Sequence, residues 1–282
     1  METIVNKPLA NTFGWLNVNG TKVNAPDKMQ QQEYELEEGA ERTIIADFAA
    51  GSRISAKLGR NATLRLVQIR RGKEEDTAAA AGNLSEGGLK GADGTAVNDV
   101  RVKCSEGARF EWYRIVLGGE ATYDNCTVEL EGDRSSFEAQ IGYRLGGEQV
   151  LDVNCEAIHT GKKTDSVINA SGVLSEKASK LMRGTIDLRK GCKGAVGNEL
   201  EDVLLMDRTV RNRSIPVILC SEEDVVGNHG ATIGRLDEDM IFYLASRGME
   251  TEAIYEMMAK AKLDSVIRRI PDEEVRRGLL EE

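Results

Sequence analysis

Apolar and polar residues alternate along the chain from Glu33 to about Arg71, as in the stretches 43–48 (TIIADF) and 62–67 (ATLRLV). Successive side chains of a β-strand point to opposite faces of a sheet. A period of two therefore predicts strands with one buried face.

Short strand-like runs continue from Val97 to about Asp224, separated by glycines that recur roughly every 13 residues. Evenly spaced strands with glycine turns are typical of a sandwich, a barrel or a stacked solenoid. Aromatic residues make up only 5% of the chain, and Pro216 is the one proline between Pro26 and Pro271. This composition favours a solenoid, because glycine lets the backbone turn a corner at each coil. The last coil of a solenoid needs covering, since it otherwise presents a bare strand edge.

The period becomes helical near the C-terminus. Apolar residues recur at helical spacing over 236–247, and Gly248 is a suitable helix stop. A second helix is predicted from about Thr251 to the residue before Pro271, and the acidic residues after this proline suit the start of a third helix.

These patterns divide the chain into an irregular lead-in over 1–32, a β core over 33–230 and a helical domain over 231–282. Within the core, the polar and Gly-rich stretch 72–99 lacks periodicity. We predict a mobile loop there, with a short alanine-rich helix over 76–81 as an alternative.

The composition excludes several classes of function. A chain of 282 residues is long enough for a sizeable core, and a net charge of −10 disfavours binding to nucleic acid. The N-terminus lacks the residue order of a signal peptide, and no apolar run approaches the ~18 residues of a membrane span. We therefore expect a soluble, cytoplasmic protein with no nucleic-acid or membrane partner. Five widely spaced cysteines argue against a disulfide framework and suit a reducing compartment.

Catalytic motifs are missing from the sequence. It contains no phosphate-binding loop, no nucleophile elbow and no His-Glu-x-x-His. Of the two histidines, His159 is expected to be structural. His229 lies beside glycines just after the last predicted strand, where it either satisfies backbone groups or presents an imidazole to iron or zinc. One imidazole cannot hold a cluster, so further ligands would have to come from another subunit.

The segment around His229 resembles the C-terminal signature of the SufB/SufD family, scaffold subunits of the SUF system of iron–sulfur cluster assembly. The residues that carry the resemblance are 227–234 (GNHGATIG), 236–239 (LDED) and 242–248 (FYLASRG). Weaker matches occur in order from about Val97, for example 117–120 (LGGE) and 183–186 (RGTI). The likeness is closer to SufD, and 15–19 (WLNVN) also resembles the start of SufD.

The resemblance implies a mainly β fold, a right-handed parallel β-helix (β-solenoid) followed by a C-terminal α-helical domain. It implies a non-enzymatic scaffold that pairs through its β-helix with a SufB-like or identical chain and docks the SufC-type ABC ATPase through its helices. The iron–sulfur cluster would be transient and shared with a partner chain, with no nucleotide bound by this chain. The predicted docking residues are Asp237, Met240, Phe242, Tyr243, Arg247, Met257 and Met258.

By position, His229 matches a SufD histidine implicated at the pairing interface, and it is our first candidate ligand for the cluster. The chain departs from the family pattern at Gly227, where SufD commonly has cysteine, and at Met206 and Gly230, where SufB has cysteine and glutamate. Cys220, nine residues before His229, is a candidate for partial replacement of these ligands.

Two alternatives remain open from the residues alone. A stand-alone β-solenoid that binds or cleaves polysaccharide would use acidic residues, which are abundant, but also stacking aromatics, which are few. A structural solenoid without any ligand is the other alternative.

Overall fold

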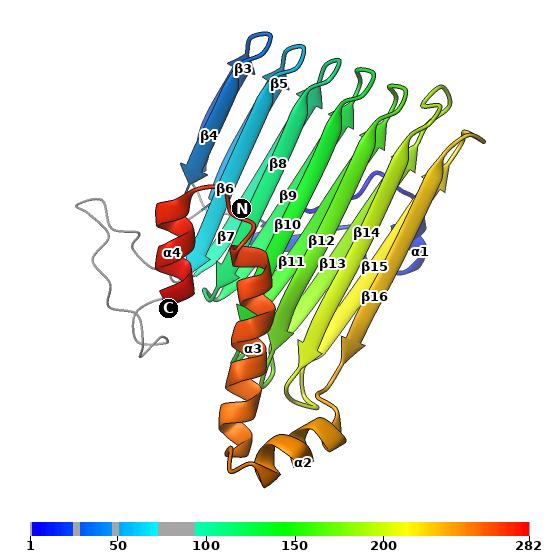
Figure 1. Cartoon of the computed structure of the whole chain (residues 1–282). Coiled ribbons are helices and arrows are strands. Elements are labelled where there is room, and N and C mark those ends of the chain that lie inside the picture. Colours follow the sequence, from blue (N-terminus) through cyan, green and yellow to red (C-terminus); the bar gives the residue numbers. More distant parts are fainter. Residues whose placement is uncertain (1, 25–28, 47–50, 73–93, 282) are drawn as a thin grey trace.

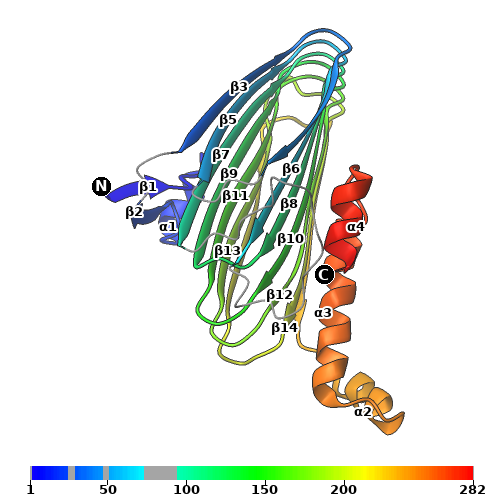
Figure 2. The same ribbon diagram turned by 90° about the vertical axis from the view of Figure 1, so that its left-hand side faces the viewer.

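Two parallel sheets of seven strands each form the body of the protein. The computed structural model describes residues 2–24, 29–46, 51–72 and 94–281. The chain passes from one sheet to the other with each strand, so that each pair of consecutive strands makes one coil (Figures 1 and 2). The predicted mainly β solenoid followed by C-terminal helices is confirmed.

The first sheet holds the odd-numbered strands and the second the even-numbered ones. The first sheet comprises β3 (Gln30–Leu36), β5 (Gly51–Leu58), β7 (Thr95–Cys104), β9 (Ala121–Leu130), β11 (Val150–His159), β13 (Ser179–Leu188) and β15 (Arg211–Cys220). The second comprises β4 (Glu41–Ala46), β6 (Thr63–Arg71), β8 (Arg109–Leu117), β10 (Ser136–Leu145), β12 (Asp165–Leu174), β14 (Val196–Leu205) and β16 (Val226–Gly234).

The core lies between the two sheets and is built from alternate residues of each strand. In-register pairing stacks equivalent side chains from coil to coil, as Phe110 of β8 stacks on Phe137 of β10 with ring centroids 5.6 Å apart. Trp112 is fully buried, and its indole Nε1 donates a 2.7 Å hydrogen bond to Oε1 of Gln68. The alternation that predicted strands is thus the alternation between this core and the outer faces.

Glycines at the corners allow consecutive turns to approach each other closely. A Cβ atom at Gly161 would overlap the carbonyl oxygen of Gly132, its counterpart in the preceding coil. Arg134 and Lys163, with φ of 59° and 54°, adopt the left-handed conformation at neighbouring corners. Of the recurrent glycines of the sequence, those at 107, 119, 132, 146 and 161 lie in turns between strands as predicted, whereas Gly172 and Gly184 lie within β12 and β13.

The first 24 residues are more ordered than the irregular lead-in that we expected over 1–32. They contain β1 (Glu2–Val5), α1 (Thr12–Trp15) and β2 (Thr21–Asn24), and β1 and β2 pair in antiparallel fashion. Together we call residues 2–24 the N-terminal unit. It lies on the outer face of the first sheet, on the opposite side of the solenoid from the C-terminal helices (Figure 2).

Three helices follow the solenoid: α2 (Glu238–Ser246), α3 (Thr251–Ile267) and α4 (Glu273–Glu281). α3 and α4 cover the outer face of the second sheet, where Val266 and Leu279 pack with Val67 and Ile115. α2 projects beyond the sheet and buries none of its residues (Figure 1). None of the helices in the described ranges is both long and apolar enough to cross a membrane.

Two boundaries differ from the sequence prediction. Strand β16 continues to Gly234, beyond the expected end of the core at 230. Strand β7 begins at Thr95, so the last residues of the stretch 72–99 are part of the first sheet rather than of a loop. Residues 73–93, including the alternative helix over 76–81, lie outside the described residues.

The substitution Gly161→Ala tests the close approach at the corners. We expect it to lower the free energy of unfolding by about 1–3 kcal/mol, because the added methyl group meets a backbone oxygen that cannot move independently of its strand. Gly234→Ala is the matched control, since nothing lies within 4 Å of a Cβ atom there. Urea unfolding of both variants measures the difference, and an equal effect of the two substitutions would contradict this account of the turns.

His159 is buried at the end of β11, as expected of a structural histidine. Its Nδ1 lies 2.7 Å from Oγ1 of Thr164 and its Nε2 lies 2.8 Å from Oγ of Ser166. Burial lowers the pKa of His159 to about 4. The imidazole is therefore neutral in the folded protein at neutral pH.

This burial predicts a loss of stability in mild acid. The unfolded chain takes up a proton on His159 near pH 6.5, whereas the folded chain does so only near pH 4. The free energy of unfolding should therefore fall through this window, by an amount on the order of 3 kcal/mol from this group. Urea unfolding of His159→Gln between pH 4 and 7 should show a flatter dependence of stability on pH than the wild type, and an equally steep dependence would contradict this account.

Candidate functional site

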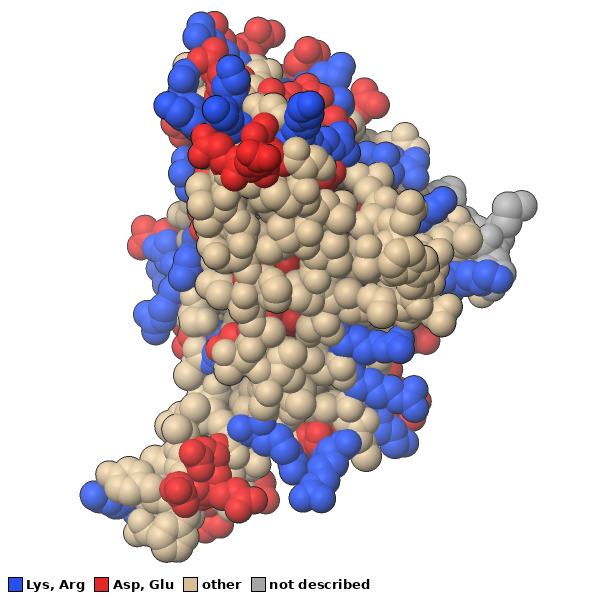
Figure 3. Space-filling view, turned by 90° about the vertical axis from the view of Figure 1, so that its right-hand side faces the viewer, with Lys and Arg blue, Asp and Glu red and all other residues tan. Residues whose placement is uncertain are grey.

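The last coil of the solenoid forms an open end. β15 and β16 are the terminal strands of their sheets, and within the described residues no further strand pairs with their outer edges. Figure 3 views the molecule from this side and shows a broad surface with few charged side chains, bordered above and below by charged groups. An unpaired strand edge presents backbone N–H and C=O groups that another strand can bind.

His229 lies within β16, not after the last strand as the sequence predicted. It is exposed and occupies the same register position as Glu199 of β14. A Cβ atom at Gly227, two residues earlier, would contact Ile218 of β15 across the core. Because side chains two residues apart share a face, His229 lies on the inward face of the last coil, which the open end leaves accessible.

Cys220 ends β15 and is also exposed, and its thiol donates a 3.1 Å hydrogen bond to the carbonyl oxygen of Glu222. Gly227 of β16 faces Ile218 of β15. Cys220 is two residues beyond Ile218 towards the turn that joins the two strands, and His229 is two residues beyond Gly227 away from that turn. At about 3.3 Å per residue this separates them by roughly 13 Å along the strands. The structure thus does not bring the two candidate ligands together. The described residues contain no group of three or more His, Cys, Asp or Glu side chains that could hold a metal ion.

A buried charged cluster lies directly beneath the open end, and the sequence analysis missed it. Lys180 of β13 forms an ion pair with Glu201 of β14, and its ammonium donates a 3.0 Å hydrogen bond to Oγ of Ser214. Glu199 is 3% exposed, and its Oε2 has no hydrogen-bond partner. Burial lowers the pKa of Lys180 to about 7 and raises the pKa of Glu199 to about 7.

The sequence did contain a sign of this cluster: charged residues occupy positions of β13 and β14 where the period-two pattern expects inward-facing apolar residues. Glu199 and Glu201 are separated by one residue, as inward-facing positions must be. Gly184 leaves the space that the carboxylate of Glu199 fills, because a Cβ atom there would overlap it. Only the tertiary structure brings Lys180 to the same layer.

The predicted docking residues fall into three groups. Met240, Phe242 and Tyr243 of α2 are exposed, Phe242 by 76% of its surface. Asp237 and Arg247 organise α2, since Asp237 caps its first turn through a 2.9 Å bond from the backbone N–H of Asp239 and Arg247 lies 5.2 Å from the ring centre of Tyr243.

The two methionines of α3 differ from each other. Met257 is exposed by 43% of its surface. Met258 packs against Val173 and Leu204 of the second sheet. Met257 therefore belongs to the free surface of α3, and Met258 to the contact that holds α3 on the solenoid.

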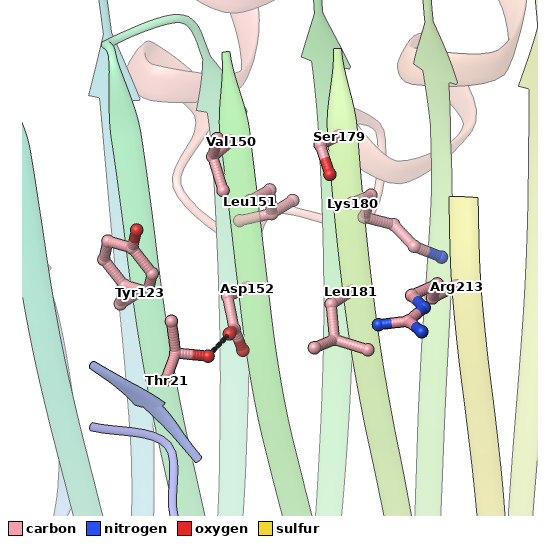
Figure 4. A pocket seen from close by; sticks show the side chains of 9 residues that line it. All are labelled: Thr21, Tyr123, Val150, Leu151, Asp152, Ser179, Lys180, Leu181 and Arg213. Carbon is pink, nitrogen blue, oxygen red and sulfur yellow. Dashed lines mark hydrogen bonds between the residues drawn. The ribbon is translucent and has the colours of Figure 1, made fainter. Parts of the chain in front are cut away.

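A hollow of about 190 Å³ lies on the outer face of the first sheet (Figure 4). Tyr123, Asp152 and Arg213 are among its lining residues, and Asp152 is hydrogen-bonded to Thr21 and paired with Arg183. Ligand pockets commonly measure ~300–1,000 Å³. With one aromatic ring and a carboxylate that is already engaged, this hollow gives no support to polysaccharide binding.

Comparison with known proteins agrees with the resemblance. Residues 23–262 match the family model described as "SUF system FeS cluster assembly, SufBD core domain". The chain is 28% identical over 204 residues to the iron–sulfur cluster assembly protein SufD of Bacillus subtilis, covering 72% of this chain and 46% of that protein.

Two further relatives carry the description "Iron-sulfur cluster assembly SufBD family protein". The one from Mycobacterium bovis is 26% identical over 173 residues, which cover 61% of this chain and 20% of that protein. The one from Staphylococcus saprophyticus is 28% identical over 170 residues, which cover 60% of this chain and 36% of that protein. The matches thus span less than half the length of each of these three relatives. Since the family model covers most of the solenoid and α2, the chain belongs to the SufBD family of the SUF system of iron–sulfur cluster assembly.

Proposed function

We propose that this chain is a non-catalytic scaffold subunit that pairs through its β-helix with a SufB-like or identical chain and docks a SufC-type ATPase through its C-terminal helices. The observation that carries the proposal is the open, weakly charged end formed by β15 and β16. Its cargo is an iron–sulfur cluster that is bound transiently and shared with the partner, and the ATPase rather than this chain binds the nucleotide. The five free cysteines suit a reducing compartment, and we place the chain in the cytoplasm.

The two ends of the solenoid differ in a way that favours pairing at the C-terminal end. At the N-terminal end β3 and β4 have seven and six residues and carry Glu33, Glu35, Glu41 and Arg42, charges that discourage strand pairing. β15 and β16 have ten and nine residues, and β16 has no titratable side chain except that of His229. β15 carries Arg211 and Arg213 near its start, so the long uncharged edge that suits the addition of a strand from a partner is that of β16.

His229 is the proposed cluster ligand or gate of this interface. It lies on the accessible inward face of β16, and the described residues hold no group of three or more metal-ligating side chains, so further ligands would come from the partner. Cys220 lies at the end of β15, too far along the coil to share a metal ion with His229. We propose a separate and secondary role for Cys220 at the edge of the same interface.

The ATPase would bind the exposed surface of α2 and the adjacent part of α3. Exposed aromatic and methionine side chains on a projecting helix form adaptable binding surfaces. Met240, Phe242, Tyr243 and Met257 provide them here. α3 is anchored to the solenoid by ion pairs of Arg144 with Glu256 and Asp202 with Lys262, which gives α2 a fixed base.

The substitution Ile233→Lys tests pairing at the open end. Ile233 of β16 is 41% exposed, and an ammonium group there would have to be buried without a partner on pairing. We expect the dissociation constant of the pair to rise about 10- to 100-fold. Ile45→Lys in β4, at the other end of the solenoid and 46% exposed, is the matched control. Sedimentation velocity measures both, and equal dissociation constants would contradict the assignment of the interface.

The substitution Phe242→Ala tests ATPase docking. Removal of an aromatic anchor from an interface should weaken binding to a SufC-type ATPase about 10- to 100-fold. The helix should remain folded, because Phe242 is exposed. Ile4→Ala, which shortens an equally free apolar side chain on β1, is the control. Calorimetric titration with the ATPase gives both affinities, and wild-type affinity of Phe242→Ala would place docking elsewhere.

A further inference from the structure

The N-terminal unit is fixed next to the open end. Phe13 of α1 is fully buried, and with Ala10 and Val18 it packs on side chains of β13 and β15. Three of the sheet residues beneath it, Ile215, Val217 and Leu219, belong to β15, the terminal strand itself. α1 therefore covers the outer face of the strand whose edge is open.

Polar contacts hold this unit rigidly on the solenoid. Nδ2 of Asn6 donates a 2.9 Å hydrogen bond to Oδ1 of Asp152, and the backbone N–H of Leu9 donates a 2.8 Å bond to Oε1 of Glu156. Nε of Arg183, which is itself fully buried and paired with Asp152, donates a 2.5 Å bond to the carbonyl oxygen of Val18. Hydrogen bonds to buried charged groups are strong, so the unit is part of the folded body rather than a loose arm.

Large apolar side chains nevertheless remain exposed on this fixed unit. Trp15, the last residue of α1, is 84% exposed, and the adjacent Leu16 is 49% exposed. The other tryptophan, Trp112, is fully buried. Tryptophan on a rigid element is the side chain most often found at the energetic centre of protein interfaces, because it buries a large area at little entropic cost.

This apolar surface continues that of the open end. Figure 1 shows α1 beside the terminal strands, and its core residue Phe13 packs with Ile215 and Val217 of β15. Val226 and Ile233 of β16 are exposed on the same end, at 50% and 41%. A partner that covers the open end is therefore well placed to reach α1.

The open end also determines what kind of partner fits. It offers two strand edges, one from each sheet, which lie about 10 Å apart as facing sheets do. A single peptide strand or helix would cover only one of them. A second solenoid of the same two-sheet construction offers two edges at the same spacing.

From these observations we propose that Trp15 and Leu16 are an anchor of the scaffold pair, in contact with a second SufBD-type solenoid that covers the open end. This inference rests on the proposed pairing function and assigns the N-terminal unit to the same interface. We commit to a second copy of this chain, which offers the same two strand edges. A chain that pairs only with a SufB-type relative would overturn this choice of partner.

The test is Trp15→Ala in the full chain, compared with Ile4→Ala. Ile4 is 59% exposed in β1 of the same unit, and the neighbouring Asn6 and Thr21 bond to Asp152 of β11, two strands away from β15. We expect Trp15→Ala to raise the dissociation constant of the pair at least tenfold and Ile4→Ala to leave it unchanged, measured by sedimentation velocity. Both variants should keep the wild-type unfolding midpoint, and Trp15→Ala should keep wild-type affinity for the ATPase, which Phe242→Ala loses.

A second measurement follows Trp15 directly in the unsubstituted chain. Labelling with 5-fluorotryptophan should give two ¹⁹F resonances, and only that of Trp15 should shift between H₂O and D₂O in the unpaired chain. Pairing should abolish this solvent shift. A solvent shift that persists in the pair, or a Trp15→Ala variant that pairs as strongly as the wild type, overturns the inference and leaves pairing itself intact. A wild-type chain that pairs neither with itself nor with a SufB-type chain overturns both.

Discussion

Each inward-facing side chain of the solenoid lies over the residue at the same register position in the next coil, and the other features of the molecule depend on this stacking. Parallel in-register strands satisfy their backbone hydrogen bonds only through neighbouring coils. A coil inside the stack is therefore complete, as Phe110 over Phe137 illustrates. The first and last coils are incomplete by the same rule, whatever residues they contain.

The outer faces of the sheets and the two open ends of the solenoid differ in how far other parts of the chain cover them. The outer face of the second sheet is covered by α3 and α4, and part of the outer face of the first by the N-terminal unit. The edge at β3 and β4 is short and charged, which discourages pairing. The edge at β15 and β16 has no covering strand in the described residues, and β16 carries no Asp, Glu, Lys or Arg. The surfaces that we assign to partners are this edge and the free helix α2.

The exposure of His229 follows from its place in the last coil of the stack. An inward-facing side chain of an inner coil is buried, as that of His159 is, and the imidazole of His159 is neutral because burial opposes the charge. In the terminal coil the same orientation leaves the side chain accessible. Beneath it, Lys180, Glu199 and Glu201 place charge in the core. These charges lie one coil below the surface that a pairing partner would cover.

The sequence by itself determined the mainly β body and the order of strands and helices, because period-two alternation and helical spacing are local properties. The family resemblance singled out His229 and the residues of α2 as candidates. The tertiary structure decided which strand is last, that Cys220 lies apart from His229, and that Met257 is free whereas Met258 is packed. It also joined Lys180 to Glu201 and brought α1 to β15. These are contacts between residues far apart along the chain, and they follow from the register of the coils, which no local pattern contains.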